Sequence, residues 1–408
     1  MVHVQFKIDN INMKKYKLGD FLDNYGDGIH GTPKYDINGD YYFINGSNLG
    51  NGKIVINDDI QKVSAEEYTK IRRPIVNGQT ILVSINGTLG KFAIYHGEKI
   101  GLGKSACFLN LKEAIYVPFI FAILMTKEFK TYLHNIAGQS TIKNVSPNQI
   151  ANYEFYAPSS LCDCIAYSQT ISKINEKIEL NRQINDNLEA MAKQLYDYWF
   201  VQFDFPNEEG KPYKSNGGVM VWNEMLKREI PQGWNDCKIK EFMRIFTGKK
   251  DVSKAVPGNY KFFSCAPEPI SSNEYIYDGY AVLVSGNGSY TGRVGFYKGK
   301  FDLYQRTYAC VLDEDEHNIS FFYYTLRYLF QPIYSGGKHG SSIPYIVLGD
   351  LADFRFAFNE TICTKFVDAA KPMFDEQLLR QKEIEALTKQ RDELLPLLMN
   401  GQASVNSD

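Results

Sequence analysis

Two places in this chain put amide, hydroxyl and basic side chains on glycine-containing turns, a chemistry that suits contact with nucleic acid. The first place carries Ser84, Asn86, Thr88 and Lys91, and the second carries Ser285, Asn287, Ser289, Tyr290 and Arg293. An Asn amide can form two hydrogen bonds with adenine, an Arg guanidinium can do so with guanine, and hydroxyl and Lys groups bind phosphate. We therefore predict that these turns are DNA-contacting loops.

A second pair of polar loops occurs further along each half of the chain. Its candidate contact residues are Ser140, Thr141 and Lys143 in the first half, and Lys338, His339, Ser341 and Ser342 in the second. Each of these residues could equally lie on an ordinary solvated turn, so no single side chain identifies a site. The recurrence of polar loops at matched positions favours the two regions as a pair.

The loops are matched because the chain contains an internal repeat. Residues 81–88 align with residues 282–289, an offset of 201, and one inserted residue then brings Gly90 onto Gly292. Further along, Phe155 meets Phe356 at the first offset again. Chance strand-and-turn patterns are the plainer explanation, but chance rarely keeps one offset across separated segments. The repeat predicts two similar globes, and hence two similar recognition surfaces.

The repeat and the helical periodicity divide the chain of 408 residues into six segments. We predict a first globular domain (1–157), a central long helix (158–200), a connector (201–234), a second globular domain (235–359), a distal long helix (360–401) and a tail (402–408). Each globe is large enough to bury a core of its own.

The two helical segments carry apolar residues at spacings of three and four. In the first, Ile171, Ile174 and Ile178 are followed by Ile184 and Leu188, with polar Asn181 and Asn185 in the seam. Each stripe could cover only its adjacent globe, but a single globe is too small for so long a stripe. We predict that the two helices pair as an antiparallel coiled coil. Two prolines, Pro372 and Pro396, predict a kink or an interruption in the second helix.

Each globe shows short strand patterns separated by turns, with a helix near its end. The first is expected to form strands at 41–44, 53–56, 80–85, 92–95 and 106–111 and a helix at 118–135, and the second repeats this with strands at 281–285, 294–297 and 307–312 and a helix at about 320–330. The fold class is therefore α+β, with small and mostly antiparallel sheets. The connector is rich in aromatic residues, which seek burial, so we expect it to be ordered and to pack on the helices.

The composition is that of a globular protein, with 44% hydrophobic and 14% aromatic residues. No apolar run is long enough to span a membrane and the N-terminus lacks a signal-peptide pattern, so we expect a cytoplasmic protein. The net charge of −2 does not favour a nucleic-acid ligand. However, residues 1–157 carry 17 basic and 14 acidic side chains, and residues 235–359 carry 14 and 13, so the globes are the parts best suited to face phosphate.

Motifs for catalysis or cofactor binding are not found in the sequence. The run from Gly101 to Ser105 resembles the end of a phosphate-binding loop, but Glu98 stands where that loop needs its first glycine. The 6 histidines lack a metal-ligand spacing, and neither a glycine-rich S-adenosylmethionine loop nor an amino-methyltransferase motif occurs. We predict a non-catalytic chain without a metal or cofactor of its own.

The order of variable globe, long helix, variable globe and long helix resembles the specificity subunits of Type I restriction-modification systems. The likeness is strongest in the helices and in residues 198–206, 217–218 and 230–234, and it covers essentially the whole chain. Two features depart from the family pattern: the prolines of the second helix, and the first globe's lack of a lead-in like the run from Pro231 to Trp234.

The resemblance implies that the globes are target-recognition domains, each reading one half of a split sequence in double-stranded DNA. It further implies that the helices act as a spacer and as docking surface for two methyltransferase (modification) subunits, joined in the complex by restriction/translocase subunits. S-adenosylmethionine, ATP and Mg would belong to those partner subunits. In such a complex the partners can share the phosphate contacts, so the isolated chain should bind DNA weakly and in a salt-sensitive way.

Two other classes remain open from the residues alone. One is a non-catalytic adaptor whose paired domains bind protein or RNA, which a preferred DNA sequence would exclude. The other is a self-contained nuclease or methyltransferase with an unrecognised site, which S-adenosylmethionine binding or DNA cleavage by the isolated chain would support.

Overall fold

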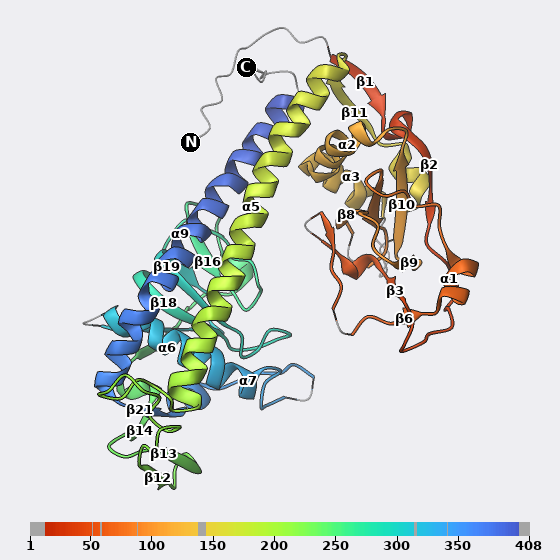
Figure 1. The fold of residues 1–408 in the computed structure, drawn as a ribbon. Coiled ribbons are helices and arrows are strands. Elements are labelled where there is room, and N and C mark those ends of the chain that lie inside the picture. Colours follow the sequence, from red (N-terminus) through yellow and green to blue (C-terminus); the bar gives the residue numbers. More distant parts are fainter. Residues whose placement is uncertain are drawn as a thin grey trace. The chain divides into compact units, whose positions relative to one another are not determined.

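The computed structural model describes residues 13–50, 52–57, 59–87, 89–137, 144–313, 316–340 and 342–399. The chain falls into two compact units, Met1–Asn181 with Glu383–Asp408, and Arg182–Lys382. Each unit combines a globe with part of two long helices, and the elements of both are drawn in Figure 1. Short strands and helices pack together in each globe, which confirms the predicted α+β class.

The first globe contains eleven strands and four α-helices among its described residues. The strands are β1 (Met13–Lys17), β2 (Leu22–Asp27), β3 (Tyr41–Ile44), β4 (Leu49–Gly50), β5 (Lys53–Ile54), β6 (Lys62–Val63), β7 (Thr80–Ser84), β8 (Phe92–Ile94), β9 (Ile100–Leu102), β10 (Ala106–Leu111) and β11 (Glu154–Pro158). The helices are α1 (Ala65–Ile71), α2 (Val117–Met125), α3 (Lys127–Ile136) and α4 (Pro147–Ala151).

A four-stranded sheet in the order β2-β10-β7-β8 forms the centre of the first globe. Every residue of β7 and β10 is buried, because α2 and α3 help to cover one face while a smaller cluster around Ile44 and Phe108 fills the other. A three-stranded sheet, β6-β3-β9, contains the one parallel pair among the described ladders of this globe, β3 with β9. The sheets are thus mostly antiparallel, as predicted.

The second globe is built on a six-stranded sheet in the order β15-β20-β18-β19-β16-β17. The strands of the whole globe are β14 (Asn235–Lys238), β15 (Arg244–Thr247), β16 (Tyr260–Phe263), β17 (Ile270–Ser272), β18 (Tyr277–Ser285), β19 (Val294–Leu303), β20 (Thr307–Val311) and β21 (Arg355–Phe358). Of these, β14 and β21 pair with each other in a separate sheet. Its helices are α6 (Ile319–Thr325), a π-helical turn (Leu326–Phe330), α7 (Gln331–Tyr334) and α8 (Leu348–Ala352).

Strand pairing supports the repeat read from the sequence. Ser84 pairs with Ala106 in the first globe, and their equivalents 201 residues later, Ser285 and Thr307, pair in the second. Val83 pairs with Phe92 as Val284 pairs with Val294, which places the inserted residue in the turn between these strands. The two globes therefore share their strand order and register although most side chains differ.

The two long helices are α5 (Leu161–Tyr196), which ends in a π-helical turn (Asp197–Val201), and α9 (Glu360–Met399). Within the first unit, the ammonium of Lys177 lies 2.5 Å from a carboxylate oxygen of Glu383, and the guanidinium of Arg391 donates to the amide oxygen of Asn175 over 3.3 Å. Within the second unit, Gln377 donates to the carbonyl of Asn185 over 3.4 Å. Residue numbers rise along one helix as they fall along the other, so in each unit the helices pack antiparallel, as predicted.

Of the kink or interruption expected in the second helix, the interruption is wrong, because α9 runs unbroken through both prolines, and the kink stays a prediction. Pro372 is exposed, and so is Asp368, whose carbonyl loses its helical N–H donor to the proline ring. Water can satisfy that carbonyl on the solvent side, so the helix continues. The side chain of Pro396 lies outside the described residues.

The helix expected at 118–135 is two helices, α2 and α3. Thr126 takes an extended conformation between them, and its hydroxyl oxygen accepts a hydrogen bond from the backbone N–H of Phe129 over 3.2 Å. A Thr that caps a new helix start breaks the run that apolar periodicity alone would continue.

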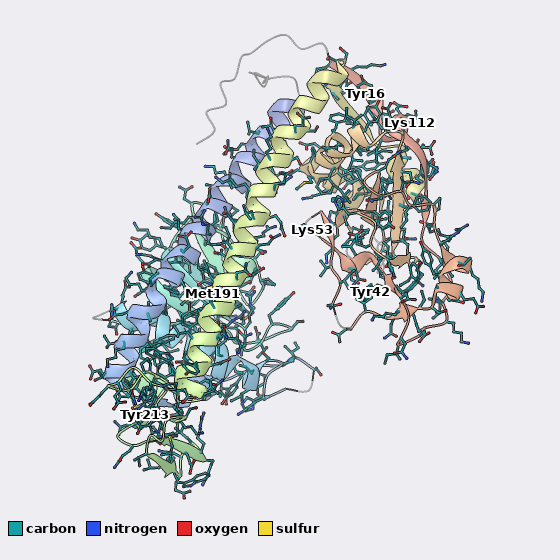
Figure 2. The ribbon with its side chains drawn as sticks, in the orientation of Figure 1. Tyr16, Tyr42, Lys53, Lys112, Met191 and Tyr213 are labelled. Atoms are coloured by element: carbon teal, nitrogen blue, oxygen red, sulfur yellow. The ribbon has the colours of Figure 1, made fainter. Side chains whose placement is uncertain are left out.

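The connector contains the hairpin of β12 (Met220–Asn223) and β13 (Arg228–Pro231) and packs its aromatic rings on the second globe and the helices. The ring centre of Phe205 lies 5.2 Å from that of Trp234 and 4.8 Å from that of Tyr213, which is labelled in Figure 2. Phe200, at the end of the first helix, contacts both Phe321 and Phe366. The ordered, packed connector expected from its composition is thus present.

Candidate nucleic-acid interface

In each globe the first predicted loop bridges a residue that follows the candidates of the second in the sequence. In the first globe Asn86 forms an isolated bridge with Asn144, the residue after the second loop. In the second globe the equivalent Asn287 bridges Tyr345, which follows Ser342 by three positions. The bridged residues of the second globe each lie 201 positions after those of the first. The same bridge, here called the loop junction, therefore occurs in both globes.

Glycines shape the turn at each junction. Gly87 and Gly288 have φ angles of 74° and 79°, a conformation that favours glycine because it lacks a Cβ atom. Gly292 has a φ of 82°, and a Cβ atom there would lie 2.4 Å from the carbonyl oxygen of Tyr334. The turns therefore keep Asn86 and Asn287 beside the second loop of each globe.

Most of the described candidate residues are exposed or half-buried. Asn86, Lys91, Asn287 and Arg293 are half-buried, whereas Ser289, Tyr290, Lys338, His339 and Ser342 are exposed. Thr88, Ser140, Thr141, Lys143 and Ser341 lie outside the described residues. A role of these residues in DNA contact stays a prediction.

Two candidates, Ser84 and Ser285, are buried. Ser84 and Ser285 are 1% and 3% exposed because each is the last residue of a central strand. The hydroxyl of Ser285 donates to the carbonyl of Cys265 over 3.4 Å. Both serines lie at the strand ends from which the loops begin, and their contact with DNA stays a prediction.

Two candidate cations of the second globe, Arg293 and Lys338, lie against aromatic rings. Arg293 lies 5.5 Å from the ring centre of Tyr290 and donates to the carbonyl of Ala266 over 2.6 Å. Burial lowers the pKa of Arg293 from its usual range. Lys338 lies 4.2 Å from the ring centre of Tyr334. Such contacts hold a cation in one position without neutralising it.

His339 is oriented from two sides. Its Nε2 atom lies 3.1 Å from a carboxylate oxygen of Asp350, and its ring stacks on Tyr345 at 5.2 Å between centres. A histidine held in this way can present its remaining ring nitrogen to a ligand in a fixed direction.

A cavity of about 270 Å³, here called the loop pocket, opens beside the bridge of Asn86 with Asn144 in the first globe. It is lined by Asp27, His30, Ile85, Asn86, Lys104, Asn144, Val145 and Ser146. The sequence reading singled out only Asn86 of these as a contact residue. The other lining residues come mainly from the end of β2, the turn after β9 and the start of α4. Strand pairing brings these segments together, and no spacing along the sequence indicates it.

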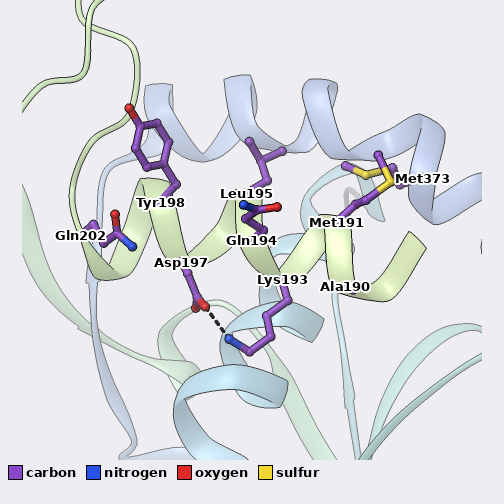
Figure 3. Close-up of a pocket in the computed structure, with 9 residues that line it drawn as sticks. All are labelled: Ala190, Met191, Lys193, Gln194, Leu195, Asp197, Tyr198, Gln202 and Met373. Carbon is purple, nitrogen blue, oxygen red and sulfur yellow. Dashed lines mark hydrogen bonds and ion pairs between the residues drawn. The ribbon is translucent and has the colours of Figure 1, made fainter. Parts of the chain in front are cut away.

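A second hollow lies on the helices of the second unit, around the end of α5. It has a volume of about 720 Å³ and is lined by Ala190, Met191, Lys193, Gln194, Leu195, Asp197, Tyr198, Gln202 and Met373 (Figure 3). Met191 and Tyr198 are 57% and 37% exposed, and Lys193 forms an ion pair with Asp197 at the rim. This helix hollow thus combines exposed apolar groups with polar ones, as protein interfaces do.

The family profile described as the Type I restriction modification DNA specificity domain matches residues 10–190 and 231–358. The two matched stretches cover both globes and most of α5. The chain belongs to the Type I restriction enzyme specificity subunits.

Relatives of this specificity subunit occur in archaea and bacteria. It is 25% identical over 358 residues to the Type I restriction enzyme MjaIX specificity subunit of Methanocaldococcus jannaschii, a match that covers 80% of this chain and 78% of the relative. It is also 33% identical over 184 residues to the EcoDI specificity subunit of Escherichia coli, covering 44% of this chain and 40% of that protein.

A solved structure shares the fold of this specificity subunit. The crystal structure of the Type I restriction-modification S subunit from Mycoplasma genitalium aligns with a TM-score of 0.56 at 18% sequence identity, covering 96% of this chain and 98% of that one. At this identity the likeness concerns the fold alone.

The described part of the specificity subunit shows no group of three or more His, Cys, Asp or Glu side chains placed to hold a metal ion. No helix among the described residues is long and apolar enough to cross a membrane.

Proposed function

We propose that this specificity subunit recognises a bipartite sequence in double-stranded DNA, with one half-site read by each globe. The observation that carries the proposal is the loop junction built twice, at Asn86 with Asn144 and at Asn287 with Tyr345, on strands of the same order and register. Two equivalent surfaces with different side chains suit two half-sites of different sequence. Residues 1–157 and 235–359 are the proposed target-recognition domains.

The helices are the proposed docking surface for two modification subunits, to which restriction/translocase subunits are added. The helix hollow supports this role, because Met191 and Tyr198 expose apolar surface beside a polar rim. Methyl transfer and cleavage belong, in this proposal, to the partner subunits, which would bind S-adenosylmethionine, ATP and Mg.

The DNA-reading role is tested by exchanging residues 235–359 for the corresponding domain of another family member. The exchanged chain, expressed with its cognate modification subunit, should direct methylation to a motif in which one half-site is new and the other is unchanged. A motif altered in both halves, or in neither, would contradict the assignment of one half-site to each globe.

The docking role is tested by Met191→Glu, which places a charge in the helix hollow. We expect this variant to lose co-purification of the modification subunit, since burying an unpaired carboxylate at an interface is costly. Leu379→Glu is the matched control, because Leu379 is 55% exposed on α9 but does not line the hollow. Equal retention of the modification subunit by both variants would remove the hollow from the proposed interface.

The rival proposal, an adaptor that binds protein or RNA, is favoured by no particular contact in the described residues. It would gain support if the purified complex of this chain with its modification subunit showed no preferred DNA sequence.

A further inference from the structure

Asp27 is the one carboxylate that lines the loop pocket of the first globe. It ends β2 and pairs with Cys107 of β10, so the sheet fixes its backbone. Its Oδ1 atom is buried and accepts no hydrogen bond from the residues that the structure describes, whereas its Oδ2 atom lies 3.4 Å from Nε2 of His30. A buried acceptor without a donor is unfavourable, so a ligand that supplies a donor here would gain from pairing with it.

The carboxylate shares the loop pocket with a cation. Lys104 is exposed in the turn between β9 and β10 and lines the same cavity. An ionised carboxylate only accepts hydrogen bonds and an ammonium only donates them. The lining of the pocket therefore includes both an acceptor and a donor.

Both A·T and C·G present a donor and acceptors in the major groove of DNA, and the usual base partners of a carboxylate and a lysine favour C·G. Cytosine shows a donor, its N4 amine, and the guanine paired with it shows two acceptors, O6 and N7. A carboxylate suits the cytosine amine, and a lysine suits the guanine edge.

We propose that Asp27 is a specificity-determining residue, which accepts a hydrogen bond from cytosine N4 while Lys104 donates to the guanine of the same C·G pair. This inference rests on the proposed function and adds to it one residue pair and one base pair. Besides His30, which faces the other oxygen of Asp27, the remaining polar side chains of the pocket are amides and a hydroxyl, on Asn86, Asn144 and Ser146. The Ser146 hydroxyl already accepts from the backbone N–H of Gln149 as the cap of α4.

The second globe does not repeat this pair. Thr247 pairs with Tyr308 as Asp27 pairs with Cys107, so an uncharged residue stands at the position of Asp27. The bridge between Lys250 and Tyr304 in the second globe corresponds to the bridge between Ile29 and Gly103 in the first. Tyr304 is thus equivalent to Gly103, and the next residue, Gln305, is equivalent to Lys104. The proposed reading thus applies to the first half-site alone, and the second globe offers a control.

The test uses the full chain with its cognate modification subunit and maps the methylated motif of three variants. Asp27→Asn replaces one oxygen of the carboxylate by a donor, and Lys104→Gln removes the charge of an exposed side chain. Both should relax the same C·G position of the half-site that survives exchange of residues 235–359, with the preference falling about 5- to 150-fold. Gln305→Ala, the control, should leave that half-site unchanged.

Retention of the second half-site in the Asp27 and Lys104 variants shows that each chain has folded and assembled. The proposal is overturned if both variants keep the wild-type motif, if they relax different positions, or if the first half-site contains no C·G pair. If Asp27→Asn abolishes all methylation, the motif of Lys104→Gln, which changes an exposed side chain, tests the proposal by itself. A wild-type chain that directs no split motif would instead refute the proposed function itself.

Discussion

Asn86 and Asn287 occupy equivalent positions in the two globes, each on a turn held by a glycine with positive φ and each bridged to the second loop. Their neighbours Ser84 and Ser285 are buried. The side chains at the strand ends are therefore buried, whereas the two asparagines on the turns are only half-buried.

Substitution of these two asparagines should act on one half-site each. Asn287→Ala should weaken sequence preference in the second half-site by about 1 to 3 kcal/mol, because a base edge loses its paired amide, and Asn86→Ala should do the same in the first. Each variant is the control of the other in methylated-motif mapping. If either one altered both half-sites equally, the asparagines would act on the fold rather than on separate bases.

In the second unit, one acidic side chain contacts both the globe and the other long helix. A carboxylate oxygen of Glu189 on α5 accepts hydrogen bonds from Tyr328 over 2.8 Å and from Tyr323 over 3.4 Å, and the other accepts one from Gln377 of α9 over 3.1 Å. Burial, followed by the charge of Glu189, raises the pKa of both tyrosines, which therefore stay neutral and keep donating. In the first unit, the ammonium of Lys53, placed in Figure 2, lies 3.3 Å from a carboxylate oxygen of Glu179, and the amide of Asn175 donates to the sulfur of Met125 over 3.7 Å.

Glu189→Ala should therefore destabilise the second unit by about 2 to 3 kcal/mol, since three donors lose a charged acceptor that is only partly exposed. All three tryptophans, Trp199, Trp222 and Trp234, lie in this unit, so their fluorescence during denaturation reports on it specifically. Asp375→Ala is the control, because its ion pair with Lys371 is exposed and should contribute less than about 0.5 kcal/mol. Equal midpoints for the two variants would contradict the role of Glu189.

Elements that depend on local pattern could be predicted from the sequence, and those that depend on distant partners could not. Periodicity placed the two long helices, and β3 and β10 have the expected bounds. Periodicity could not show that Thr126 would cap a second helix or that water beside an exposed Pro372 would let α9 continue. The loop pocket was missed because Asp27 and Lys104 are brought together by β2, β10 and their neighbours rather than by any spacing along the chain.

At the scale of the whole molecule, the net charge of −2 limits the affinity of the isolated chain for DNA. DNA binding requires phosphate neutralisation by basic side chains, and the slightly basic globes are offset by acidic helices. A specificity subunit of this kind would depend on its partners for much of its affinity.

The isolated chain should therefore bind DNA weakly, and its affinity should fall steeply as salt rises from about 50 to 200 mM. The complex with the modification subunit should bind more tightly and should prefer its target over unrelated DNA. Fluorescence anisotropy with a labelled duplex measures both. High affinity of the isolated chain that does not depend on salt would argue against shared phosphate contacts.

The central claim is that this chain alone determines a split DNA target. The most direct measurement maps adenine methylation across the genome of cells that express the modification subunit with this chain, and of cells that express the modification subunit alone. We predict a bipartite motif, two defined half-sites with an unspecified spacer, in the first cells and no motif in the second. The same methylation in both, or none in either although the two proteins co-purify and the modification subunit binds S-adenosylmethionine, would contradict the account.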